Sequence, residues 1–116
     1  MTTRKSRAAD TQRIAADWYR PRGFPWVQDA GAGRQGRDLL GMPGLAPEVK
    51  ARTGFDPLAW VRQAARNAAG DVPFVLLRCN GQGPESIEDW PVIVRNGDWT
   101  PIIRAAGYGD PEQVAS

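Results

Sequence analysis

Residues 38–50 read Asp-Leu-Leu-Gly-Met-Pro-Gly-Leu-Ala-Pro-Glu-Val-Lys, and this stretch decides the fold. Two short apolar runs flank a Met-Pro-Gly turn, a pattern that predicts two strands joined as a hairpin. Side chains along a strand alternate between its faces, so Glu48 and Lys50 project from one face while Val49 points into the core. We expect the hairpin to bring Asp38 alongside Glu48 and Lys50.

The lysine in this stretch is unusual for the chain. Thirteen arginines accompany only two lysines, Lys5 near the N-terminus and Lys50. Arg does not replace Lys where a compact ammonium group must lie beside a reacting group. The chain has no His and a single Cys, which excludes a Cys/His zinc site and His-based acid–base catalysis.

Two carboxylates followed by a lysine suit a magnesium-dependent nuclease. Mg²⁺ prefers hard oxygen ligands, and Asp38, Glu48 and the backbone carbonyl of Val49 supply them; Mn²⁺ can substitute. Lys50 would then position the attacking water and neutralise charge that develops on the phosphate. Pro47 cannot donate to a strand ladder, so we expect it at a sheet edge or a bulge.

The elements around this stretch predict an α/β fold with a mixed sheet flanked by helices. The expected order begins with a helix at 8–20, a short strand at 24–28 that Pro25 weakens, and the two short strands at 38–41 and 45–53. A helix then begins at Asp56-Pro57 and runs to 69, followed by strands at 72–79 and 90–95 and a strand or helix at 99–106. The run at 72–79 is apolar almost throughout, which indicates burial on both faces. One domain at 8–106 would lie between a basic, flexible tail at 1–7 and a frayed tail at 107–116.

Positive charge gathers around the two acids although the net charge is only +2. Such clustering favours a polyanionic partner, DNA in particular. The candidate phosphate contacts are Arg4, Lys5, Arg7, Arg34, Arg37, Arg52, Arg62 and Arg66; for any one of them a solvated surface position is the alternative. No apolar run reaches the roughly 20 residues of a membrane span, and no secretory signal precedes the domain, so we expect a cytoplasmic protein.

Three segments together resemble the PD-(D/E)xK nuclease superfamily: Gly-Arg-Gln-Gly-Arg-Asp-Leu-Leu-Gly-Met-Pro-Gly at 33–44, Glu-Val-Lys at 48–50 and Trp-Val-Arg-Gln-Ala at 60–64. Within that superfamily the chain is most similar to small Holliday-junction resolvase-like proteins of archaeal, phage and actinobacterial type, over roughly residues 8–95. The resemblance implies a restriction-endonuclease-like core, a homodimer that cuts branched DNA, one metal site in each subunit, and a supporting role for Gln63.

Other interpretations remain open. The first helix of this group usually carries a Glu near the metal, whereas this chain has Gln12 at the corresponding position. The protein could therefore be a non-catalytic DNA-binding or assembly protein on a decayed nuclease fold. It could also be a related nuclease that acts on flaps, nicks or duplex ends. In the simplest reading, Asp38 caps a turn and Glu48 pairs with Lys50 at the surface.

Overall fold

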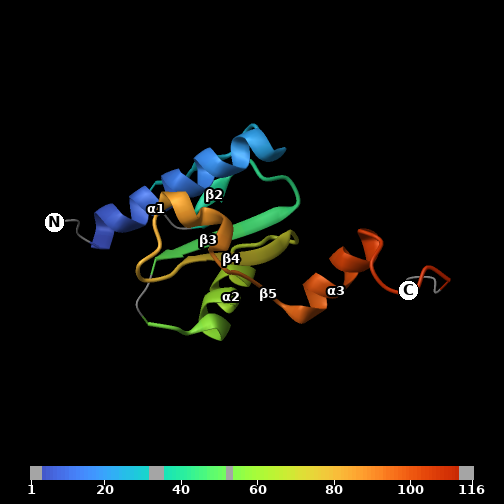
Figure 1. The fold of residues 1–116 in the computed structure, drawn as a ribbon. Coiled ribbons are helices and arrows are strands. Elements are labelled where there is room, and N and C mark those ends of the chain that lie inside the picture. Colours follow the sequence, from blue (N-terminus) through green and yellow to red (C-terminus); the bar gives the residue numbers. More distant parts are fainter. Residues whose placement is uncertain (1–3, 32–35, 52–53, 113–116) are drawn as a thin grey trace.

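The computed structural model describes residues 4–31, 36–51 and 54–112 (Figure 1). Its helices are α1 (Arg4–Tyr19), α2 (Pro57–Arg66) and α3 (Asn96–Ala105), with short 3-10 helices η1 (Arg20–Arg22) and η2 (Pro84–Asp89). Its strands are β1 (Gln28–Asp29), β2 (Leu39–Leu40), β3 (Leu45–Ala51), β4 (Val72–Arg78) and β5 (Val92–Val94).

Among the described residues, β3, β4 and β5 form a mixed three-stranded sheet in that order. β3 and β4 run parallel, with Glu48 opposite Val75 and Lys50 opposite Leu77, while β5 is antiparallel to β4. Parallel neighbours need a crossover connection, and α2 provides it. The expected α/β fold with a mixed sheet between helices is confirmed.

The two faces of the sheet are covered by different helices (Figure 1). One cluster joins Ile14 of α1 to Val49 and Phe74, and a second joins Val61 of α2 to Val75. Strand side chains alternate between faces, so β3 and β4 contribute to both layers. The central strand β4 is buried from residue 73 to 78, as its apolar run predicts.

The start of α2 also follows the prediction. The carboxylate of Asp56 accepts a hydrogen bond from the Ala59 N–H at 3.4 Å, and Pro57 occupies the first helical position. An acceptor side chain at the N-cap satisfies an otherwise unpaired N–H, and Pro lacks the N–H that would be unpaired there.

The predicted hairpin is wrong. β2 pairs with β1 in an antiparallel bridge, Gln28 with Leu40 and Asp29 with Leu39. β3 instead pairs with β4 through the backbone groups on one of its two sides. Its other side carries Pro47, which lacks the N–H that a second ladder would need. This is the edge position that the sequence predicts for Pro47.

The chain ends differ in part from prediction. α1 begins at Arg4, four residues before the helix start that the sequence predicts at residue 8. The segment for which the sequence left strand and helix open is the helix α3, which starts at Asn96.

Candidate active site

Asp38 binds the open edge of β3. Its N–H donates to the Pro47 carbonyl at 3.2 Å, and its Oδ2 accepts a hydrogen bond from the Val49 N–H at 2.7 Å. The backbone polar groups of alternate residues in a strand point to opposite sides. Those of residues 47 and 49 point away from β4 and are therefore free to bond with Asp38. The Val49 carbonyl lies on the same side as the Val49 N–H in an extended strand. Asp38 thus lies beside β3 without belonging to a ladder with it.

Glu48 and Lys50 project toward α2, as alternation predicts. The Lys50 Nζ lies 3.2 Å from Glu48 Oε1 and donates to Gln63 Oε1 of α2 at 2.9 Å. Glu48 is 4% exposed and Lys50 is 8% exposed. A solvated surface pair would lie open to water, so the low exposure speaks against that simplest reading of the two residues.

The carboxyl groups of Asp38 and Glu48 lie close enough to influence each other's ionisation. Burial, followed by the charge of Asp38, raises the pKa of Glu48 to about 7, although Lys50 opposes this shift. Burial also raises the pKa of Asp38, against the lowering effects of the Val49 N–H and Lys50. Two acids beside one ammonium leave an excess of negative charge when both are ionised, which favours a bound cation.

One oxygen of this group has no protein partner. Glu48 Oε2 is buried and accepts no hydrogen bond, and such an atom costs free energy unless something pairs with it. Hard carboxylate oxygens are the ligands that Mg²⁺ prefers, so Asp38, Glu48 and the Val49 carbonyl fit a magnesium ion. Within the described ranges, no group of three or more His, Cys, Asp or Glu side chains is arranged to hold a metal. Waters and substrate oxygens would have to complete the coordination, as is usual for Mg²⁺.

Arg37 holds the chain just before Asp38 in place. Its guanidinium donates to the backbone carbonyls of Asn67 and Leu45 at 3.2 and 3.1 Å, and lies 2.8 Å from Asp71. It also donates to the Ala68 carbonyl. Carbonyls at the end of a helix lack partners within that helix, and a cation there is favourable. From the sequence, Arg37 was predicted to bind phosphate, and its role in positioning the chain was missed. Its place directly before Asp38 is the one feature of the sequence that could have indicated this role.

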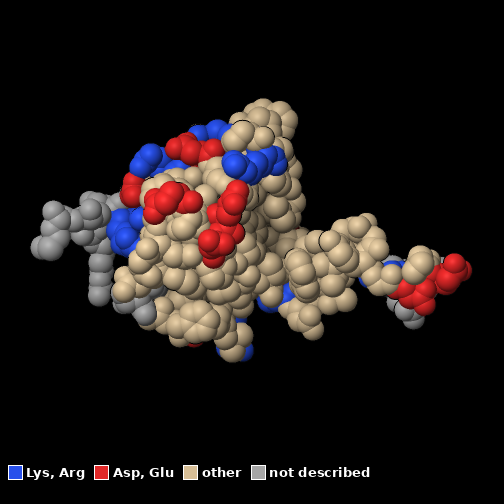
Figure 2. Space-filling model, in the orientation of Figure 1, with Lys and Arg blue, Asp and Glu red and all other residues tan. Residues whose placement is uncertain are grey.

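Among the other predicted phosphate contacts, Arg62 and Arg66 are exposed on α2 and Arg7 is half-buried on α1. Arg66 lies one turn after Gln63, on the same side of α2. The side chains of Arg4 and Lys5, and the whole of Arg34 and Arg52, lie outside the described residues. On the face shown in Figure 2, most of the charged side chains of the body gather over α1 and η2, and few lie along α3.

Gln12 belongs to a different helix from Gln63, the residue that contacts Lys50. It belongs to α1, which packs on the face of the sheet opposite to α2. Its side chain is 6% exposed, and its amide oxygen is buried without a hydrogen-bond partner. Gln12 is therefore a second unpaired buried acceptor, on the neighbouring layer of the fold.

The chain matches no protein-family model, no curated protein and no solved structure. None of the described helices combines the length and apolar character needed to cross a bilayer. Functional inference therefore depends on the geometry around Asp38, Glu48, Lys50 and Gln63.

Proposed function

We propose that this chain is a magnesium-dependent, structure-selective DNA endonuclease of the PD-(D/E)xK type, with a restriction-endonuclease-like core. The observation that carries the proposal is the convergence of the Asp38 and Glu48 carboxyl groups with the Lys50 ammonium, next to an unpaired carboxylate oxygen. The three side chains come from an edge strand and the segment beside it, and Gln63 reaches them from α2.

The chain's own residues suit the hydrolysis of a phosphodiester. Asp38 and Glu48 would hold Mg²⁺, which when bound polarises the scissile phosphate and acidifies a water. Lys50 is held on two sides, by Glu48 and Gln63, so its ammonium has a fixed direction. It would orient the attacking water and offset negative charge on the phosphate. Arg62 and Arg66, exposed on α2, would contact flanking phosphates.

Four-way junctions are the substrate that we favour, because the residue pattern around the two acids is most similar to that of small junction resolvases. Flaps, nicks and duplex ends are the alternatives within the same chemistry. Substrate shape is read by the spacing of phosphate contacts, so direct comparison of substrates distinguishes them.

The test is incubation with a labelled four-way junction, a matched duplex and a flap, with and without Mg²⁺. We expect metal-dependent cleavage of the junction by the wild type and loss of at least about 100-fold in rate for Asp38→Asn. Asn retains an oxygen that can accept from the Val49 N–H, so the variant should fold and bind junction DNA. Asp29→Asn, a change to an exposed acid in β1, is the matched control and should cut normally.

A non-catalytic DNA-binding or assembly protein is the second candidate, and Gln12 favours it, because a neutral amide stands where related nucleases carry an acid. Under this alternative the wild type shifts junction DNA in a gel and leaves it intact whether or not Mg²⁺ or Mn²⁺ is present. Cleavage by Asp38→Asn at the wild-type rate would exclude the proposed metal site altogether.

A further inference from the structure

An exposed aromatic side chain lies at the start of α2, the helix that also carries Gln63. Phe55 stands one residue before the cap at Asp56, and it is 74% exposed. Its ring is perpendicular to the Trp60 ring, with 5.8 Å between the two centroids. Single exposed apolar residues are common on protein surfaces, so the surroundings of Phe55 must show whether its ring has a use.

Contact with Trp60 fixes the Phe55 ring and leaves most of it open. Residues just before a helix cap and at the end of the first helical turn often pack together as a hydrophobic staple. Trp60 is itself packed against Val61, Ala64 and Val75. An aliphatic side chain would form the same staple, so the staple does not require an aromatic ring at position 55. A ring held in place in this way loses little conformational freedom when a flat ligand binds to it.

The aromatic pair lies one helical turn from the candidate active site. Trp60 and Gln63 are three positions apart on α2, which makes them neighbours on the same side of the helix. Gln63 accepts a hydrogen bond from the Lys50 Nζ at 2.9 Å. Phe55 is therefore within reach of a nucleotide that lies next to a phosphate bound at Lys50.

The surface around Phe55 combines an aromatic ring with a cation. Arg62 is exposed on α2, four positions after Leu58, which is 56% exposed, and side chains at this spacing are neighbours. The acid next to Phe55, Asp56, is engaged in the cap of α2 through the Ala59 N–H. Proteins bind bases of single-stranded DNA by stacking them on aromatic rings while cations contact the phosphates.

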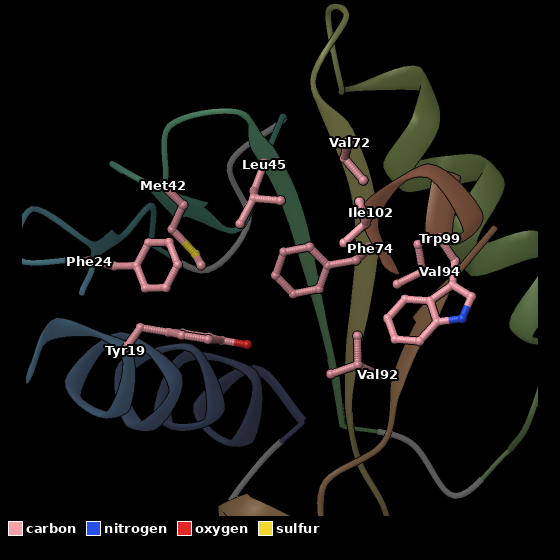
Figure 3. Close-up of a pocket in the computed structure, with 10 residues that line it drawn as sticks. All are labelled: Tyr19, Phe24, Met42, Leu45, Val72, Phe74, Val92, Val94, Trp99 and Ile102. Carbon is pink, nitrogen blue, oxygen red and sulfur yellow. The ribbon is translucent and has the colours of Figure 1, made fainter. Parts of the chain in front are cut away.

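A second group of aromatic side chains lacks this combination. Phe74 and Trp99 are among the residues that line an apolar cleft of about 200 Å³ beside α3 (Figure 3). None of the described residues that line this cleft is charged, so it offers no cation to a phosphate. Trp99 is 48% exposed and provides a control for the loss of an accessible aromatic ring outside α2.

We propose that Phe55 stacks on a base with an open face, at a branch point or strand end of the DNA substrate. This inference rests on the proposed nuclease function and specifies its substrate class, DNA in which the double helix is interrupted beside the cut phosphate. In an intact duplex both faces of a base are covered by its neighbours, and unstacking it costs free energy. Phe55 therefore selects interrupted helices by a contact that phosphate spacing does not supply.

The test is DNA binding measured by fluorescence anisotropy in EDTA, with a labelled four-way junction, a flap and a matched duplex. Phe55→Leu keeps an apolar side chain against Trp60 and has no aromatic face. It should weaken binding to the branched DNAs by at least about 5-fold, the lower end of what loss of base stacking costs. Binding to the duplex should change by less than about 2-fold. Phe55→Tyr retains the ring and should bind as the wild type does, and so should Trp99→Leu.

Wild-type affinity of Phe55→Leu for both branched DNAs would overturn the proposal, as would an equal loss of affinity for branched and duplex DNA. A wild type that binds all three DNAs equally, or binds none of them, would also overturn it. An effect on one branched DNA alone supports the proposal and names the preferred substrate. Circular dichroism of each variant checks that it is folded.

The binding assay contains no metal, so it is independent of cleavage. A wild type that prefers branched DNA through Phe55 but cuts nothing in Mg²⁺ would refute the nuclease function and leave the stacking contact in place. A wild type that cuts in Mg²⁺ while Phe55→Leu binds every DNA normally would do the opposite. Failure of the stacking proposal and failure of the proposed function are therefore distinguishable.

Discussion

Glu48→Gln should change how the stability of the metal-free protein depends on pH. In the folded chain the pKa of Glu48 is raised from its ordinary value of 4.5 to about 7, chiefly by burial. The folded state therefore holds a proton that the unfolded state has already released between these two pH values. Because the unfolded state binds fewer protons there, the free energy of unfolding falls as the pH rises through this window.

The size of the effect follows from the shift. At 1.36 kcal/mol per pKa unit, the contribution of Glu48 to the free energy of unfolding should fall by roughly 2 to 3 kcal/mol between pH 5 and pH 8. Glutamine is nearly the same size and carries no titrating proton, so the variant lacks this contribution. The wild type should thus lose stability relative to Glu48→Gln across the window.

Urea unfolding monitored by tryptophan fluorescence, with EDTA present, measures the difference at each pH. The chain has five tryptophans, which makes the signal strong. Added Mg²⁺ should stabilise the wild type at pH 8, because a cation bound to the folded state alone shifts the equilibrium toward it. It should leave Glu48→Gln nearly unchanged. Parallel pH profiles for the two proteins would refute the picture of Glu48 as a buried, ionisable acid.

Two further changes test how the segment around Asp38 is held. Arg37→Ala should lower the free energy of unfolding by about 3 kcal/mol, because it leaves helix-end carbonyls unpaired. The control, Arg62→Ala on the exposed face of α2, should lower it by less than about 0.5 kcal/mol. Urea titration measures both. Gly41→Ala should destabilise the protein by more than about 2 kcal/mol, because its Cβ would lie 2.2 Å from the Trp26 carbonyl oxygen at a φ of +83°. Gly44→Ala has a similar φ of +81° and open space around it, so its smaller loss, seen as a smaller drop in melting temperature, isolates the steric part.

Features set by neighbouring residues could be predicted from the sequence. The cap at Asp56 and Pro57 depends on two adjacent positions, and burial of β4 follows from one apolar run. The common face of Glu48 and Lys50 follows from strand alternation alone. The fold class was predictable for the same reason, because it needs only the order and type of the elements.

Features set by distant parts of the chain could not be predicted in this way. Strand β2 pairs with β1, ten or more residues earlier, and nothing in residues 38–50 specifies that choice. Two of the three carbonyls that accept hydrogen bonds from Arg37 belong to residues 67 and 68. The pairing of Lys50 with Gln63 needs the crossover geometry of α2. α3 was ambiguous because Pro101 and the apolar residues near it suit both a strand end and a helix.

Proline at the border of the sheet has a consequence for aggregation. Exposed strand borders are templates on which other chains add as further strands, the first step toward fibres. On β3 the outward N–H is missing at Pro47, and Asp38 already occupies the outward N–H of Val49. A strand from another chain would have to displace the Asp38 carboxylate, and it would still lack a hydrogen-bond donor at Pro47. The same side chain that we expect to hold the catalytic ion thus also protects the protein from self-association along this border.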